Sequence, residues 1–145
     1  MVLLENIYDS YDNLIETKDL VNGESYSYQY DKHNNVIRKK YEDYENVIII
    51  DYLYNKYNEV IKETIDTNGT IKEIEYSYDD IGNLVSFNLL NGEEENIKYD
   101  SLNRLKEINL GNIYKKNYQY LVNEDHTGQL IDKEEYTKDG IINER

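Results

Sequence analysis

Tyrosines alternate with polar residues in short stretches of this chain, as in Tyr26-Ser27-Tyr28-Gln29-Tyr30. A period of two is typical of β-strands, in which alternate side chains share one face. The same spacing recurs in four later pairs: Tyr52/Tyr54, Tyr76/Tyr78, Ile97/Tyr99 and Tyr118/Tyr120. We therefore predict that the tyrosines lie mainly on one face of one sheet, each more buried than the residue between them: Tyr28, Tyr30, Tyr52, Tyr54, Tyr76, Tyr78, Tyr99, Tyr118 and Tyr120.

A turn signal follows the last tyrosine of a stretch. The next residue can accept a backbone hydrogen bond in an Asx turn, and it is Asp9, Asp31, Asn55, Asp79 or Asp100. The residue four positions after the tyrosine tolerates a positive φ and is never β-branched. These residues are Asp12, Asn34, Asn58, Gly82 and Asn103. We predict five tight turns, called tyrosine turns below, and structural roles for these side chains.

The tyrosine turns recur at a nearly fixed distance, with Tyr-to-Tyr steps of 22, 24, 24 and 21 residues. A period of this length indicates a repeat architecture. Each repeat also needs a return turn, which Asn-Gly pairs favour. The candidates are Asn22-Gly23, Asn68-Gly69, Asn91-Gly92 and Gly111-Asn112, with a weaker signal over residues 41–47.

The predicted fold is all-β: tandem antiparallel β-hairpins form one twisted, curled open sheet of roughly eleven or twelve short strands. Residues 1–145 are expected to be a single domain of about six repeats. The pattern loosens after Tyr120, where residues 121–129 suggest an enlarged tyrosine turn, and a partial copy follows at Tyr136.

The amino-acid composition limits the classes of molecule that the chain is expected to bind. The net charge of −14 and pI near 4.5 argue against nucleic acid or an anionic membrane, because phosphate binding needs a basic patch. This charge suits a basic protein partner. The chain has no cysteine, no signal peptide and no apolar run long enough to span a membrane, so a complete chain is expected to be cytoplasmic.

The stretch Tyr78-Asp79-Asp80-Ile81-Gly82-Asn83-Leu84 resembles the YD repeat of the Rhs (rearrangement hotspot) family, and the similarity runs over about residues 8–142. The resemblance implies β-sheet strips, which in that family spiral into shells around the toxic domains of bacterial polymorphic toxins. Family shells use many more repeats, and their self-cleavage motif contains proline and tryptophan, both absent here. A fragment of such a protein would be exported or displayed on the cell surface.

Catalytic chemistry is not evident in the sequence. His33 is expected to pack, and His126 to lie in a solvated loop. The Asp79-Asp80 pair fails the spacing of a calcium loop. We therefore expect no enzyme, no metal site and no cofactor.

The leading functional hypothesis is a non-catalytic β-repeat scaffold or protein-binding module like a fragment of an Rhs toxin shell. The alternative is a small acidic immunity protein that inhibits a basic toxin domain, with Glu93, Glu94 and Glu95 as candidate binding residues. An enzyme with dispersed carboxylates and a carbohydrate-binding tyrosine surface are further alternatives. Unpaired end strands would also favour a homo-oligomer.

Overall fold

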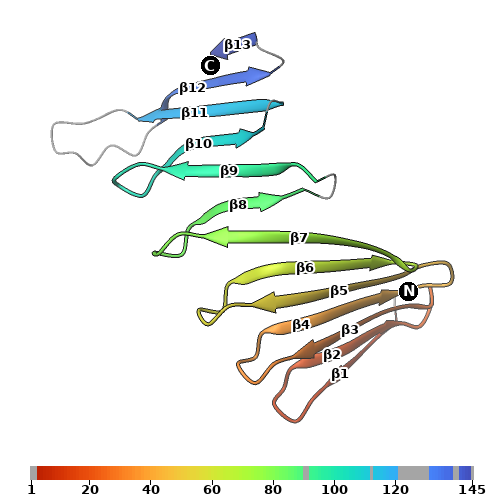
Figure 1. The fold of residues 1–145 in the computed structure, drawn as a ribbon. Helices are drawn as coiled ribbons and strands as arrows, with labels where there is room; N and C mark the ends of the chain where they lie inside the picture. The colour runs from red at the N-terminus through yellow and green to blue at the C-terminus, as the bar shows by residue number, and fades with distance from the viewer. Residues whose placement is uncertain (1–2, 90–91, 112, 121–130, 139–140, 145) are drawn as a thin grey trace. The chain divides into compact units, whose positions relative to one another are not determined.

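In the computed structural model the chain is a succession of β-hairpins (Figure 1). The structure describes residues 3–89, 92–111, 113–120, 131–138 and 141–144, and these contain no helix. The strands are β1 (Leu4–Tyr8), β2 (Leu14–Asp19), β3 (Glu24–Tyr30), β4 (Val36–Glu42), β5 (Val47–Tyr54), β6 (Val60–Thr67), β7 (Thr70–Tyr78), β8 (Leu84–Asn88), β9 (Glu94–Tyr99), β10 (Leu105–Leu110), β11 (Tyr114–Tyr120), β12 (Ile131–Lys138) and β13 (Ile141–Glu144).

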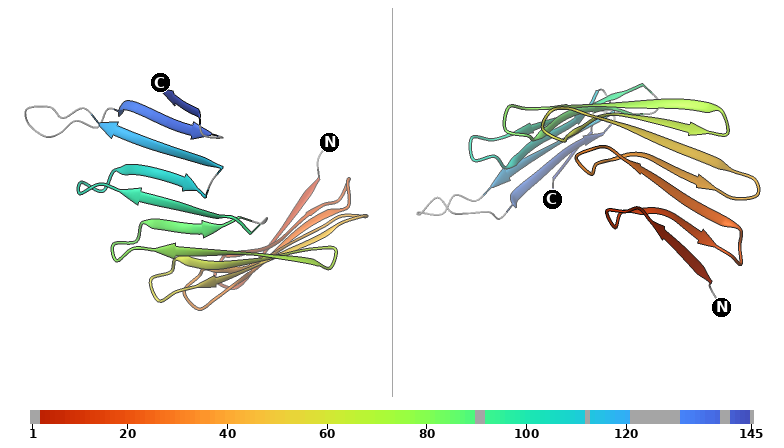
Figure 2. Two further views of the ribbon diagram at one scale, coloured as in Figure 1. Left: turned by 45° about the horizontal axis from the view of Figure 1, so that its top comes forward. Right: turned by 90° about the horizontal axis from the view of Figure 1, so that it is seen from below.

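Every strand pairs antiparallel with the next in the chain, and the order in the sheet is the order in the sequence (Figure 2). The sheet is open, because β1 and β13 do not pair with each other. The predicted all-β fold of tandem antiparallel hairpins in one open sheet is therefore confirmed.

The chain forms two compact units, Met1–Glu75 and Tyr76–Arg145. In the first, residues 70–75 of β7 pair with β6. In the second, residues 76–78 of β7 pair with β8. The assignment of all 145 residues to a single domain stays a prediction.

Each tyrosine turn has the same register. Tyrosine pairs with the aliphatic residue six positions later, as in Tyr30↔Val36 and Tyr54↔Val60, and a register shift lies beside the pair. The residue four after the tyrosine has a positive φ in all five copies: Asp12 63°, Asn34 67°, Asn58 63°, Gly82 89° and Asn103 60°. The restricted choice of residue at this position therefore has a backbone cause.

The return turns are more varied. Asn68 and Gly69, with φ of 52° and 86°, form a two-residue loop between β6 and β7. The weak signal at 41–47 is also a turn, closed by a 3.0 Å hydrogen bond from Asp43 N–H to the Asn46 carbonyl. Asn91 and Asn112 lie outside the described residues.

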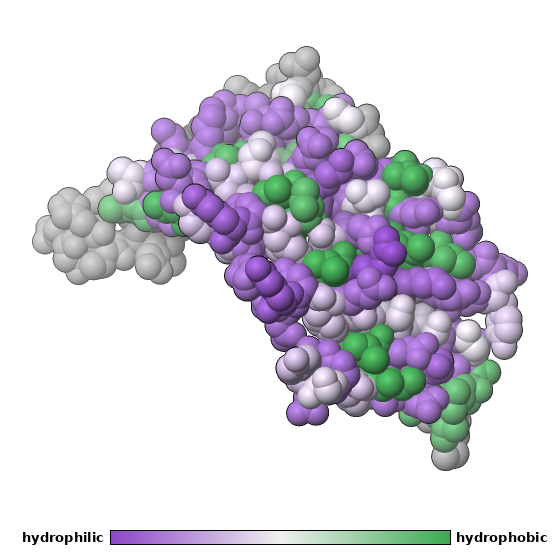
Figure 3. All heavy atoms as spheres, turned by 60° about the horizontal axis from the view of Figure 1, so that its bottom comes forward, coloured by the Kyte–Doolittle hydropathy of each residue, from purple (hydrophilic) through white to green (hydrophobic). Residues whose placement is uncertain are grey.

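No described side chain is fully buried. The predicted alternation is nevertheless present, because Tyr52 and Tyr54 are half-buried while Leu53 between them is 56% exposed. The face in Figure 3 accordingly shows apolar patches interrupted by polar side chains. Each unit is therefore a sheet without a second layer to form a closed core.

Replacing Asn34 tests the backbone requirement of the tyrosine turn. Asn34→Ala should lower the free energy of unfolding by about 1–2 kcal/mol, because alanine in the left-handed region is strained. Asn34→Gly should change it by only a few tenths of a kcal/mol. Urea denaturation of the two variants measures this difference, and equal losses would contradict the assigned turn.

Candidate protein-interaction surface

The aspartate that opens a tyrosine turn is a multiple hydrogen-bond acceptor. Asp31 Oδ1 accepts from the backbone N–H groups of His33 (2.8 Å) and Asn35 (2.9 Å). Asp31 N–H in turn donates to the Asn35 carbonyl at 2.9 Å. The same pattern occurs at Asp9, Asn55, Asp79 and Asp100. These side chains are therefore part of the backbone structure and are not free to bind a ligand through that oxygen.

The electrostatics agree with this role. Hydrogen bonds from Asn35, first among them the backbone N–H, lower the pKa of Asp31. The Asn83 and Arg104 side chains are the main cause of the lowered pKa at Asp79 and Asp100. The turn carboxylates are thus held in the charged form.

The residue five positions after the tyrosine completes the turn, and sequence reasoning missed it. Asn35 Nδ2 donates to Asp31 Oδ2 at 3.1 Å, and Arg104 Nε donates to Asp100 Oδ2 at 2.7 Å. In the third copy the roles are reversed, because Asn55 Nδ2 donates to Glu59 Oε2 at 2.7 Å. The signal was present in the sequence: the one copy that begins with Asn also carries a carboxylate at this later position.

Tyrosine hydroxyls join neighbouring repeats. Tyr54 Oη donates to the backbone carbonyl of Val36 at 2.7 Å, reaching the start of the strand in the preceding repeat. Equivalent bonds run from Tyr30 to Leu14 (2.8 Å), Tyr99 to Leu84 (3.1 Å) and Tyr120 to Leu105 (2.6 Å). Partial burial is the main cause of the raised pKa values of Tyr54 and Tyr120. The aromatic ring lies over the sheet, and its hydroxyl joins the repeat of the tyrosine to the preceding repeat.

Adjacent turns also touch directly. Asn35 Nδ2 donates to Asn58 Oδ1 at 3.0 Å in the first unit, and Asn83 Nδ2 donates to Asn103 Oδ1 at 2.6 Å in the second. These bonds join the second and third tyrosine turns of the first unit and the two tyrosine turns of the second unit.

The face that carries the alternating tyrosines is called the tyrosine face. In the first unit, strand register aligns Tyr26 with Tyr41 and Ile48. The rings of Tyr26 and Tyr41 lie 5.0 Å apart between centroids. A shallow hollow of about 160 Å³ lies here, lined by Tyr26, Tyr28, Lys39, Lys40, Tyr41, Ile48 and Ile50. Its lining combines the aromatic and aliphatic side chains of three neighbouring strands, β3, β4 and β5.

The second unit has its own part of the tyrosine face. Tyr76 stacks on Phe87 with ring centroids 6.0 Å apart. Ile97 pairs with Ile108 across β9 and β10, and Lys116 Nζ lies 4.8 Å from the centre of the Tyr118 ring. Both units thus present half-exposed aromatic and aliphatic side chains on this face.

The opposite face, called the charged face, is covered by ion pairs. Arg38 binds Asp51 through two contacts of 2.5 and 2.7 Å. The other pairs in the first unit are Lys18–Glu16, Lys40–Glu42 and Lys62–Glu73. In the second unit Glu107 contacts Lys98 at 2.9 Å and Lys115 at 2.8 Å, and its pKa is lowered mainly by Lys115. These charges largely satisfy one another, which suits a solvated face.

The candidate binding residues Glu93, Glu94 and Glu95 do not form one patch. Glu94 and Glu95 are consecutive in β9, so their side chains point to opposite faces. Glu94 is exposed, whereas Glu93 and Glu95 are half-buried. A partner-binding role for all three stays a prediction, and a single flat surface could not contact them together.

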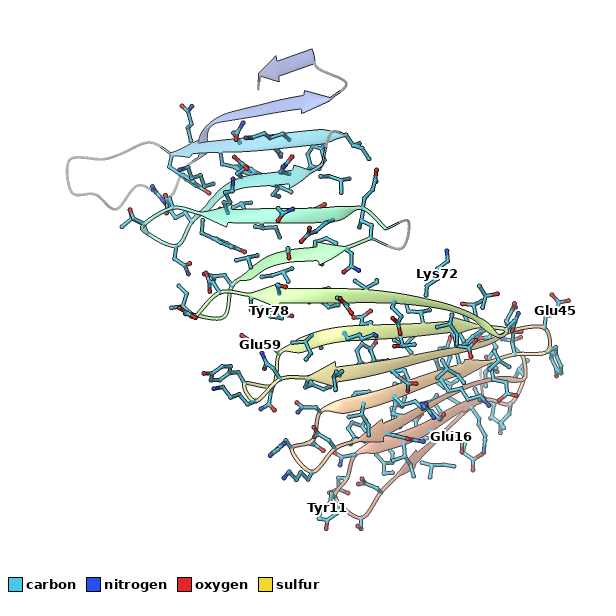
Figure 4. The ribbon with its side chains drawn as sticks, viewed as in Figure 1. Tyr11, Glu16, Glu45, Glu59, Lys72 and Tyr78 are labelled. Carbon is cyan, nitrogen blue, oxygen red and sulfur yellow. The ribbon has the colours of Figure 1, made fainter. Side chains whose placement is uncertain are left out.

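The third position of the tyrosine turn is the outermost. The packing predicted for His33 is wrong, because its side chain is 58% exposed. Tyr11, Tyr57, Ile81 and Leu102 occupy this position elsewhere and are 85%, 69%, 72% and 60% exposed. Figure 4 shows Tyr11 projecting from the turn between β1 and β2. The backbone N–H at this position donates to the side chain that opens the turn, as His33 N–H does to Asp31 Oδ1, while the side chain itself projects outward.

Among the described residues no cluster of His, Asp and Glu could hold a metal ion. The described part of the chain likewise has no helix that could cross a membrane. His126 lies outside the described residues.

Comparison with known proteins identifies the fold. No protein-family model and no curated protein matches the chain. Among solved structures, it is similar to the crystal structure of TcdB2-TccC3-Cdc42, with a TM-score of 0.56 and 14% identity over 98% of this chain. The Photorhabdus luminescens Tc holotoxin pore carrying the TccC3-D651A mutation gives a TM-score of 0.55, also at 14% identity and 98% coverage.

A third similar structure is TcdB2-TccC3 without its hypervariable C-terminal region, with a TM-score of 0.54 and 14% identity over 94% of this chain. In all three cases the match covers 9% of the other chain. The likeness therefore shows that the chain shares its fold with a part of these Tc toxin structures, and the chain spans about a tenth of the length of each.

Removing one tyrosine hydroxyl tests the link between repeats. Tyr54→Phe should lower the free energy of unfolding by about 0.5–1.5 kcal/mol, because the Val36 carbonyl loses a hydrogen bond while the ring stays. Tyr57→Phe is the matched control, and its exposed position predicts no more than about 0.5 kcal/mol. Equal effects of the two changes in chemical denaturation would contradict a structural role for the hydroxyl.

A double-mutant cycle tests the interaction between the side chains of the reversed pair Asn55–Glu59. Asn55→Asp alone should destabilise the protein, because it places a second carboxylate beside Glu59. Adding Glu59→Asn should restore stability by recreating the arrangement of Asp31 and Asn35. We expect a coupling free energy above about 0.5 kcal/mol. Additive effects in thermal and urea unfolding would show that the pair does not interact.

Proposed function

We propose that this chain is a non-catalytic wall segment: a strip of β-hairpins whose tyrosine face packs against another polypeptide. The observation that carries this proposal is the amphipathic sheet without a covering layer. One face bears half-exposed aromatic and aliphatic side chains, and the other bears ion pairs. A sheet with one apolar face ordinarily buries that face against a second layer.

The internal contacts support a scaffold. Turn aspartates bind backbone N–H groups, tyrosine hydroxyls bind the neighbouring repeat, and charged side chains bind each other. These contacts leave apolar area uncovered on the tyrosine face, and Leu53 and Ile71 on the charged face are also exposed. A wall segment of this kind would lie wherever its longer Rhs-like protein lies, and a protein partner is the ligand that a broad apolar face favours.

The fold of the neighbours fits this proposal. The similar solved structures are multi-component Tc toxin assemblies. Their chains are far longer than this one, so the proposal concerns a segment of wall and its contact with a polypeptide, not the activity of a complete toxin.

The alternative is an acidic inhibitor of a basic toxin. Its support is the net charge of −14, combined with a charged face on which the lysines and arginines are already paired. The excess negative charge would then attract a cationic protein over a long range, and the attraction would weaken with salt.

Hydroxyl-radical footprinting distinguishes the two functions. The protein is labelled both after purification and within complexes taken from cells that produce it naturally. A wall segment should show several-fold lower oxidation of Tyr26 and Tyr52 in the complexes, with the turn-tip control Tyr57 unchanged. This protection should survive 1 M salt, because apolar contact is not screened.

Two results would contradict the wall function. One is equal labelling of Tyr26 and Tyr52 in the free and complexed protein. The other is protection confined to carboxylates of the charged face and reversed by 1 M salt, which would support the inhibitor instead.

A further inference from the structure

Two of the three return turns of the first unit expose large apolar side chains, and the third, at residues 67–70, carries only threonine, asparagine and glycine. Leu20 and Val21, between β2 and β3, are 54% and 60% exposed, and Tyr44, between β4 and β5, is 87% exposed. Leu3 and Leu4 lie beside the first of these turns, since Leu20 N–H donates to the Leu3 carbonyl, and they are 47% and 58% exposed. We call residues 19–24, 42–47 and 67–70 the return edge.

The return edge is a fixed structure. A side chain at Gly23 would lie 2.5 Å from the Tyr44 hydroxyl, so the Tyr44 ring rests against the bare α-carbon of the neighbouring turn. Val47 N–H donates to Asn68 Oδ1 at 2.7 Å, which joins the second turn to the third. The exposed side chains are therefore held in a row and need little ordering on binding.

All the charged residues of the return edge are acidic. Its turns contain Asp19, Glu24, Glu42, Asp43 and Glu45 but no lysine or arginine. Asp19 and Asp43 stay ionised because backbone and side-chain hydrogen bonds lower the pKa of each, that of Asp43 to about 2. Figure 4 shows Glu45 projecting from its turn. By contrast, the tyrosine turns of the same unit carry Lys32 and Lys56.

The distance between neighbouring return turns favours a helical binding partner over an extended peptide. Neighbouring return turns are separated by two strands, or about 10 Å. Seven residues of α-helix rise about 10.5 Å, whereas residues on one face of an extended strand recur about every 6.7 Å. A helix with apolar residues seven positions apart therefore matches the row, and an extended peptide does not.

We propose that the return edge of the first unit is a docking surface for a basic amphipathic helix. Its apolar residues would contact Leu20, Val21 and Tyr44, and its lysines or arginines would lie over the carboxylates of the same turns. Like charge disfavours a second copy of the return edge as the occupant. This proposal does not depend on the tyrosine face, so its failure would leave the wall function untouched.

The test uses the full chain and a 21-residue helical peptide with leucine at heptad positions a and d and lysine elsewhere. Binding is measured by calorimetry against two control peptides, one with the same composition in shuffled order and one with glutamate in place of lysine. We expect the heptad peptide to bind at least about tenfold more tightly than either control.

Variants locate the site. Tyr44→Ser should weaken binding about tenfold, and Glu45→Lys about threefold at low salt. Tyr57→Ser, at an exposed tyrosine turn, should leave binding unchanged, and circular dichroism checks that each variant folds. Equal binding of the shuffled peptide, or an equal loss with Tyr57→Ser, would overturn the proposal. So would a dimer in sedimentation that Tyr44→Ser abolishes, because a second copy would then occupy the edge.

Discussion

The hydrogen bond from a tyrosine hydroxyl to the carbonyl of the preceding repeat is the contact on which this architecture depends. No described side chain is fully buried, so the packing of a closed core contributes little to the position of one hairpin on the next. The backbone ladder joins adjacent strands, but Tyr54 reaches across to Val36 in the preceding repeat. The bond is partly buried, and a hydrogen bond away from water is stronger than one in water. A phenylalanine-based array could cover the same surface but would lack this fixed link.

The repeats could be predicted from the sequence because their causes are local. A positive φ admits few residue types, and the backbone N–H groups that donate to Asp31 lie within four residues of it. The partners of Tyr30 and Tyr54 were not predictable in this way, since each hydroxyl binds a residue 16 or 18 positions away. His33 was misjudged for a similar reason. The sequence shows that it replaces apolar residues, but only the structure shows that this position is outermost.

The candidate surface was harder to predict than the fold. Glu93, Glu94 and Glu95 are close in sequence, yet strand geometry sends neighbours to opposite faces. Conversely, Leu20 and Tyr44 are far apart in sequence, yet they lie on adjacent turns because each repeat advances by two strands. The residues of an interaction surface on a repeat sheet therefore lie about one repeat apart in the sequence. A run of similar residues within one strand does not identify such a surface.

The reversed pair Asn55–Glu59 shows how such an array can change over time. Both members lie in one turn, four residues apart, and their exchange of donor and acceptor leaves the backbone pattern as it is in the other copies. A damaging substitution can thus be repaired inside its own repeat, with no matching change elsewhere. An array of this kind can diverge copy by copy, and each turn becomes a separate place where new recognition can arise without disturbing the rest.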